Sequence, residues 1–216
     1  VYNDNRWLPG AIDSVLTQGH PDWEIVVGDN ASTEEIEPIV LGYNDPRIRY
    51  HRWDTHVPID ENFNRTALLT RYPWVQLLSA DDRLRPGCLE RIAGAIESWP
   101  PTAGRLAMVL TACRRVDEDG RSADHVWYGT RRRLEVATGV YDAPAWFDVH
   151  LRDGHPPWNL GSVVVARTVI DESGGFFRPE VGLSCDVELS LRAAAYGSVM
   201  YIDEPLLDFM VRPDAD

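Results

Sequence analysis

Two adjacent carboxylates follow an apolar run in the middle of the chain. The run from Val75 to Ala80 ends at Asp81 and Asp82. We interpret it as a buried strand that delivers both carboxylates to the rim of a sheet, where open α/β sheets bind their ligands. A divalent cation that bridges to phosphate oxygens relieves the cost of holding two like charges together. The dipeptide therefore predicts a metal–diphosphate site; the alternative is a helix cap at Asp82 and a solvated Asp81.

Strands and helices alternate around this run. β-rich runs predict strands, and apolar residues at helical spacing predict helices. The predicted strands are 24–28, 48–53, 74–79, 106–112, 161–166 and 198–202, and the predicted helices are 6–18, 60–72, 141–151, 185–196 and one that begins at Pro86. A Ser32–Glu35 capping box opens a further helix, and Asp119-Gly120 is a hairpin-turn signal. The alternation predicts an α/β fold with a mostly parallel central sheet flanked by helices.

Length, charge and cysteines narrow the class of protein. We expect residues 1–216 to form a single domain whose first strand is truncated. The net charge of −13 argues against nucleic-acid binding. Three widely spaced cysteines fit a reducing, cytoplasmic compartment better than a disulfide framework. No apolar run approaches the ~20 residues of a membrane span, and no signal peptide is recognisable.

Several segments carry a family pattern along nearly the whole chain. They are Val1–Asn3, Ser14–Gln18, Glu24–Thr33, Asp45–Tyr50, Leu77–Asp82 and Cys185–Arg192. In order and spacing they resemble the inverting family-two glycosyltransferases of the GT-A fold. The resemblance implies binding of a nucleoside-diphosphate sugar at the carboxyl edge of the first half of the sheet.

Three residues of the first half, Tyr2, Asp29 and Asn64, match positions of that family, and Arg65 follows the third. By the resemblance, Tyr2 would stack on or flank the base, and Asp29 would accept a hydrogen bond from it. Asn64 would support the nucleotide loop, and Arg65 would reach phosphate. The alternatives are core packing for Tyr2, an Asx turn for Asp29, and a plain polar helix face for Asn64-Arg65.

Ser79-Ala80-Asp81 stands at the family's Asp-x-Asp motif. Ser79 replaces the acidic residue that usually meets the ribose, and a hydroxyl can still bond a ribose hydroxyl. The resemblance implies that Asp81 binds Mg²⁺ or Mn²⁺ together with the diphosphate. Asp82 would be a neighbouring ligand or a brace of the loop.

The second half supplies the residues expected to do the chemistry. Asp186 aligns with the base that deprotonates the acceptor hydroxyl; the alternative is that it only complements the start of its helix. Cys185 stands where the family usually has Glu, and Arg212 stands near a His that helps to bind metal or diphosphate. Trp158 lies where the family builds its acceptor pocket, although it fits a core residue equally well. Arg131-Arg132-Arg133 is more typical of a solvated loop than of a phosphate clamp.

The leading prediction is an enzyme of glycan or polysaccharide biosynthesis. It would move a sugar from a nucleotide donor, a UDP-sugar first, to a carbohydrate, lipid-linked or protein acceptor, in the cytoplasm or at the inner face of the membrane. One alternative is a sugar-nucleotide binding module without turnover, which the departures at Ser79, Cys185 and Arg212 suggest. The other is a nucleotidyltransferase of similar fold, although no Gly-rich basic phosphate loop is present in the N-terminal segment.

Overall fold

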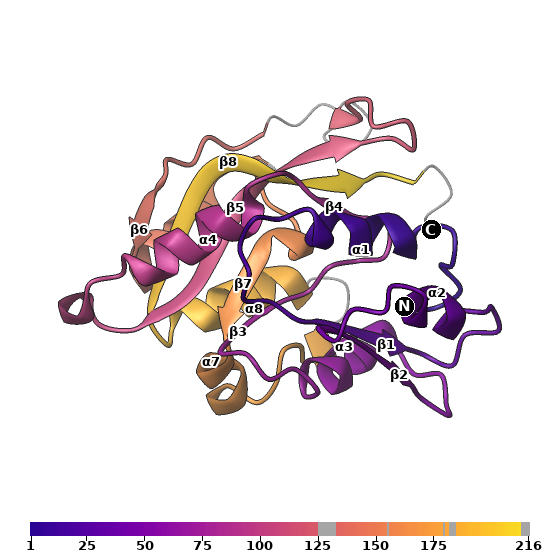
Figure 1. Ribbon diagram of the computed structural model, residues 1–216. Coiled ribbons are helices and arrows are strands. Elements are labelled where there is room, and N and C mark those ends of the chain that lie inside the picture. The colour runs from indigo at the N-terminus through magenta and orange to yellow at the C-terminus, as the bar shows by residue number, and fades with distance from the viewer. Residues whose placement is uncertain (125–132, 155, 179, 182–184, 213–216) are drawn as a thin grey trace.

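The computed structural model describes residues 1–124, 133–154, 156–178, 180–181 and 185–212. The N-terminal part contains a parallel pair of strands, β1 (Ile25–Asp29) and β2 (Ile48–Arg52), in which Ile25 lies opposite Ile48. Helix α1 (Leu8–Leu16) precedes β1, and α2 (Glu37–Leu41) joins β1 to β2. In Figure 1 this pair lies at the lower right, beside α3 (Ile59–Ala67).

A six-stranded sheet forms the rest of the framework (Figure 1). Its main path runs in the order β3 (Trp74–Gln76), β7 (Val163–Ala166), β5 (Leu106–Val116), β8 (Ser198–Met210) and β4 (Arg83–Leu84), and β6 (Gly139–Tyr141) also pairs with β8. The remaining elements are α4 (Cys88–Glu97), α6 (Ala143–Leu151), α7 (Arg167–Glu172), α8 (Cys185–Ala194) and the 3₁₀ turns η1 (Pro101–Ala103) and η2 (Leu160–Ser162).

The α/β class with helices flanking a central sheet is confirmed, but the expectation of a mostly parallel sheet is wrong. Only β1–β2 and β5–β8 are parallel among the described strand pairs. Strand β7 lies between β3 and β5 and runs against both, with Val164 opposite Gln76 and Val109. The start of β7 lies beside the end of β3, and the end of β7 lies beside the start of β3, so the two strands are antiparallel. Helix–strand alternation predicts parallel neighbours only for strands joined by a crossover, and β7 is inserted between such strands.

Helices cover both faces of the long strand β5. Nearly every residue of β5 is buried, which explains its continuous apolar sequence. On one side Met108 and Leu110 pack in a cluster with residues of α6, α7 and α8. On the other side Val109 and Cys113 pack with residues of α4. Burial on both faces makes this strand the rigid centre of the domain.

Two local features position the end of β1. A Cβ at Gly28 would lie 2.0 Å from Thr66 Oγ1, so glycine lets α3 pack directly on the strand. The predicted capping box is wrong, because α2 begins at Glu37 and not after Ser32. The amides of Thr33 and Glu34 instead donate to the side chain of Asn3, which ties the loop after β1 to the N-terminal segment.

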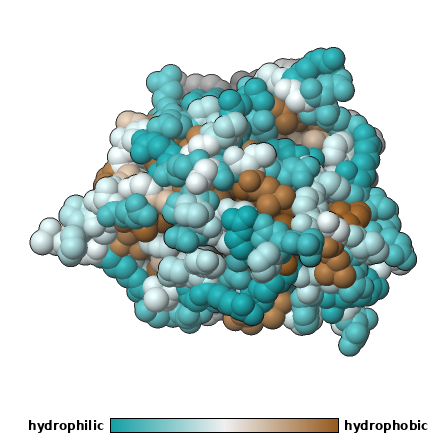
Figure 2. Space-filling model, viewed as in Figure 1, coloured by the Kyte–Doolittle hydropathy of each residue, from teal (hydrophilic) through white to brown (hydrophobic). Residues whose placement is uncertain are grey.

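The surface on the side seen in Figure 1 is mostly hydrophilic, with small separate hydrophobic areas (Figure 2). None of the helices within the described ranges has both the length and the apolar character needed to cross a membrane. The Asp119-Gly120 turn is confirmed: Gly120 has φ +77°, and the Asp117 amide donates to Arg121 O at 2.9 Å.

Candidate functional site

Asp29, the last residue of β1, is the centre of a buried hydrogen-bond network. Its side chain has no exposed surface. Oδ1 accepts the Ser32 amide at 2.9 Å, and Oδ2 accepts the Tyr50 hydroxyl at 2.6 Å and Arg52 Nη1 at 2.8 Å. Burial acts to raise the pKa of Asp29, but these hydrogen bonds outweigh it and hold the pKa below its usual value.

This network favours the Asx-turn interpretation of Asp29. Three donors already occupy the carboxylate, so a base could reach it only if Arg52 or Tyr50 moved. Arg52 is itself half-exposed, and its guanidinium is the outermost member of the network. Contact of Asp29 with a nucleotide base therefore stays a prediction, in which the side chain of Arg52 would have to swing outward.

Tyr2 lies beside the end of β1. The Val1 ammonium donates to Gly28 O at 2.8 Å, and the Asn30 amide donates to Val1 O at 2.9 Å. The Tyr2 ring is 44% exposed and meets the His56 ring edge-on, with centroids 4.3 Å apart. Tyr2 is therefore exposed at this edge and not packed in the core, which was the alternative interpretation.

Arg65 of α3 reaches the same edge. Its Nη2 donates to Asn30 Oδ1 at 2.6 Å and its Nε to Asn62 Oδ1 at 3.0 Å, and its guanidinium lies 4.3 Å from the Trp53 ring centroid. Arg65 is thus more than a plain polar helix face, because it joins α3 to the loop after β1. Its contact with phosphate remains a prediction.

Asn64 braces a different loop from the one predicted. Its Nδ2 donates to Phe177 O at 2.9 Å, and its Oδ1 accepts the Phe177 amide at 2.7 Å. Phe177 itself is 1% exposed. Asn64 therefore clamps the Gly174–Phe177 segment, which precedes α8, to the helix that packs on β1.

The Ser79–Asp82 segment forms a tight turn after β3. The Asp82 amide donates to Ser79 O at 3.1 Å, and Ser79 and Asp81 are partly exposed. Asp82 is fully buried, and its Oδ1 accepts the Met210 amide at 3.0 Å. Oδ2 has no hydrogen-bond partner among the described residues. Burial, and then the charge of Asp81, raise the pKa of Asp82 to about 8.

For Asp82 the structure favours the bracing alternative, and its role as a metal ligand stays a prediction. Its carboxyl faces the interior, where a Cβ at Gly161 would lie 3.2 Å from Oδ2. A residue held there braces the turn against the end of β8, which was the alternative role. The raised pKa and the buried, unpartnered oxygen favour a proton on Asp82 in the metal-free protein.

Asp81 is partly exposed and is paired with Arg212. Arg212 Nε lies 2.7 Å from Asp81 Oδ2, and Arg212 Nη2 donates to Asp4 Oδ1 at 2.9 Å. The two acids lie far apart in the sequence, and the guanidinium also lies 5.7 Å from the Trp7 ring centroid. The single residue Arg212 thus joins the N-terminal segment to the turn after β3.

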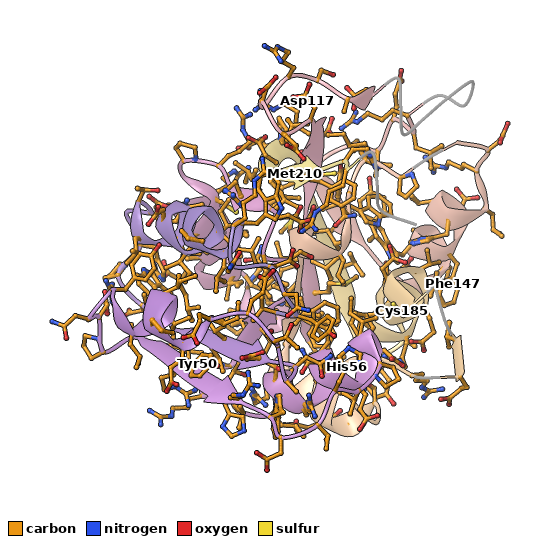
Figure 3. The ribbon with its side chains drawn as sticks, turned by 90° about the vertical axis from the view of Figure 1, so that its right-hand side faces the viewer. Tyr50, His56, Asp117, Phe147, Cys185 and Met210 are labelled. Carbon is orange, nitrogen blue, oxygen red and sulfur yellow. The ribbon has the colours of Figure 1, made fainter. Side chains whose placement is uncertain are left out.

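Asp186 lies in the first turn of α8. Its Oδ1 accepts the Val187 amide at 2.8 Å, a local contact that leaves the carboxylate partly exposed. In the view of Figure 3 the neighbouring Cys185 lies below Met210 and above His56. His150 lies within electrostatic reach of Asp186, and burial lowers the pKa of His150. The helix start therefore presents a carboxylate with a histidine nearby.

Trp158 belongs to the core. It is 6% exposed and stacks on Trp146, with ring centroids 4.9 Å apart and an angle of 28°. Tyr201 packs edge-on against it at 5.6 Å. The core alternative is therefore confirmed for Trp158. Of the arginine run, Arg131 and Arg132 lie outside the described residues, and Arg133 forms an ion pair with Asp203 at 2.9 Å.

The described residues contain no metal centre built from protein ligands alone, and the predicted site, in which a cation is shared between Asp81 and a diphosphate, stays a prediction. No group of three or more His, Cys, Asp or Glu side chains within the described ranges is arranged to hold a metal ion. Ser79 is neutral, Asp82 is buried, and Asp81 already carries a guanidinium 2.7 Å away. A divalent cation would meet one carboxylate and one competing positive charge.

Sequence reasoning missed Asp4, Arg52 and His150 as parts of the site. Asp4 binds Arg212 across nearly the full length of the chain, and Arg52 closes the Asp29 network from the neighbouring strand. One signal was readable for Arg52, because residues at the ends of two parallel strands lie at one edge. No spacing in the sequence points to Asp4 or to His150.

The sequence and the fold define the class of this protein. The family description for glycosyl transferase family 2 matches residues 1–133, more than half of the chain. The chain belongs to this family. It is 30% identical over 92 residues to the succinoglycan biosynthesis protein ExoO of Rhizobium meliloti (strain 1021), an overlap of 43% of this chain and 26% of ExoO.

Solved structures share the fold at low sequence identity. S. aureus TarS 1–349 in complex with UDP-GlcNAc matches 100% of this chain and 58% of its own, with a TM-score of 0.75 and 15% identity. The Pyrobaculum calidifontis mannosyltransferase PcManGT, in complex with GDP-Man and Mn²⁺, matches 95% of this chain and 52% of its own, with a TM-score of 0.61 and 19% identity. The chain spans less than two thirds of the length of its relatives.

Proposed function

We propose that this chain transfers a sugar, with inversion, from a nucleoside-diphosphate sugar to an acceptor hydroxyl in the biosynthesis of a glycan or polysaccharide. The family gives the reaction class, and the names of ExoO and of the nucleotide-sugar complexes support the pathway and the donor. A UDP-sugar is the first donor to test. The acceptor would be a carbohydrate, a lipid-linked sugar or a protein, in the cytoplasm or at the inner face of the membrane. The free thiols Cys88, Cys113 and Cys185 support a reducing compartment.

One observation carries the proposal: the N-terminal segment connects the end of β1 to the turn after β3. Val1 bonds Gly28 and Asn30 at the edge where Tyr2, Asp29 and Arg65 meet. Three residues later Asp4 joins Arg212, which reaches Asp81. A nucleotide with its base near Tyr2 and its diphosphate near Asp81 would follow this continuous edge.

The chain's own groups divide the reaction between them. Asp186 takes the proton of the acceptor hydroxyl as its oxygen attacks the anomeric carbon. The anomeric C–O bond to the diphosphate breaks, and the leaving oxygen keeps the electron pair. A cation must stabilise the charge that forms there. The sequence predicts Mg²⁺ or Mn²⁺ for this role, whereas the site as built offers the guanidinium of Arg212.

The test compares donor binding with turnover. We expect one of the UDP-, GDP- or TDP-sugars to raise the melting temperature of the wild-type chain selectively. Asp186→Asn should keep that binding and reduce donor hydrolysis at least ~100-fold, since general-base catalysis contributes about 10²–10⁴-fold. Asp171→Asn, an exposed change on α7, is the matched control.

Two results separate the proposal from its alternative. Turnover that is unaffected by Asp186→Asn would remove Asp186 from the chemistry. Donor binding without turnover in the wild type would identify a sugar-nucleotide binding module. Cys185 in the place of the usual Glu, and the Arg212–Asp81 pair, are the observations that keep this second function in view.

A further inference from the structure

Two arginines lie beside Asp81. Arg212 contacts both Asp81 and Asp4, and its side chain is 29% exposed. Arg83 is within electrostatic reach of Asp81, and its Nη1 donates to Asp82 O at 2.8 Å and to Ala80 O at 3.3 Å. Asp13 also lies within electrostatic reach of Arg83, so three carboxylates, of Asp4, Asp13 and Asp81, face two guanidinium groups, and the buried Asp82 adds a further charge when it ionises. The Arg212 guanidinium already compensates the charge of Asp81, so a divalent cation would have to displace it.

Arg212 has the geometry of a prepared phosphate ligand. Asp4 accepts a hydrogen bond from Nη2, and the Asp81 carboxylate lies 2.7 Å from Nε in an ion pair without hydrogen-bond alignment. Among the described residues none accepts a hydrogen bond from Nη1, so this nitrogen remains for an incoming oxygen. A guanidinium whose orientation is set by two carboxylates loses little freedom on binding an anion, and its planar fork suits two phosphate oxygens.

We propose that Arg212 is the diphosphate-binding cation of this transferase and that Asp81 holds Arg212 in place instead of binding a metal. This inference rests on the proposed function. As the anomeric C–O bond breaks, the leaving diphosphate gains one negative charge, which Arg212 stabilises through hydrogen bonds. The acceptor proton goes to Asp186. Donor binding is then independent of Mg²⁺ and Mn²⁺, although PcManGT was crystallised with Mn²⁺.

Calorimetric titration of UDP, with GDP in parallel, tests the inference in buffer containing EDTA and in buffer containing Mn²⁺. The wild-type Kd for UDP or GDP should agree within about threefold between the two buffers. Arg212→Gln should weaken binding in EDTA by about tenfold or more, the loss expected for a charge-assisted contact. Arg91→Gln removes one charge of an exposed ion pair between α4 and Glu204, and should leave binding unchanged.

A second variant and the two buffers keep the outcomes distinct. Arg212→Lys keeps the charge but loses the planar fork, so it should bind more weakly than wild type and still without metal. Wild-type binding that disappears in EDTA and returns with Mn²⁺, with Arg212→Gln behaving like wild type, would overturn the role of Arg212 while leaving the transferase intact. No binding of UDP, of GDP, or of TDP titrated in the same two buffers, would overturn the proposed function itself. Circular dichroism confirms that each variant is folded.

Discussion

Replacing Asn64 with alanine should loosen the segment that precedes α8. The change removes two hydrogen bonds, of 2.9 and 2.7 Å, to the backbone of Phe177. Because Phe177 is 1% exposed, its amide and carbonyl would be left with poor access to water. Each lost hydrogen bond costs about 0.5–1.5 kcal/mol, and an unsatisfied buried group costs about 1–3 kcal/mol. We expect the free energy of unfolding to fall by about 2–4 kcal/mol in total.

Urea unfolding and scanning calorimetry measure this loss. For a chain of this size it corresponds to a fall in melting temperature of about 4–16 °C. Asn5→Ala, at an exposed position near the N-terminus, is the control and should change stability by less than about 0.5 kcal/mol.

The same variant tests a functional consequence. Asn64 does not touch Asp81, whereas the segment that it clamps leads to the helix that carries Asp186. Turnover should therefore fall more than nucleotide affinity. A loss of stability below about 0.5 kcal/mol for Asn64→Ala would refute the reasoning, because it would mean that the clamp contributes no net free energy.

Two further changes test the buried groups of the site. Asp82 has a pKa raised from 3.8 to about 8, so the folded state binds a proton more tightly than the unfolded state and loses stability as pH rises through this window. Asp82→Asn should remove that loss. In urea unfolding, the free energy of unfolding of the variant relative to that of the wild type should therefore rise from pH 4 to pH 8. A difference between the two proteins that stays constant over this range would contradict a buried, protonated Asp82. Trp158→Ala should lower the free energy of unfolding by about 3–5 kcal/mol, as expected for a buried aromatic residue. If this variant were as stable as the wild type, Trp158 would instead be an exposed residue of the acceptor pocket.

The sequence determined the class of elements and the positions that end them. Continuous apolar runs predicted β1, β3 and β5, and Asp29 does end β1, whereas β3 ends at Gln76 and Asp81 lies in the turn that follows it. These features are local, since they depend on residue spacing within a few turns of chain. Family resemblance is carried by the same short segments, and for that reason the order of residues is enough to reveal it.

Tertiary structure alone decided which side chains meet. Asp82 and Met210 are 128 positions apart, Asn64 and Phe177 are 113 apart, and Arg212 and Asp4 are 208 apart. No periodicity encodes such pairs, because they arise when packed helices and strands bring distant segments to one edge. Two adjacent aspartates look equivalent in the sequence, yet the turn after β3 buries Asp82 and leaves Asp81 beside an arginine. The difference between a brace and a binding residue is set by the direction in which the folded turn points each carboxylate.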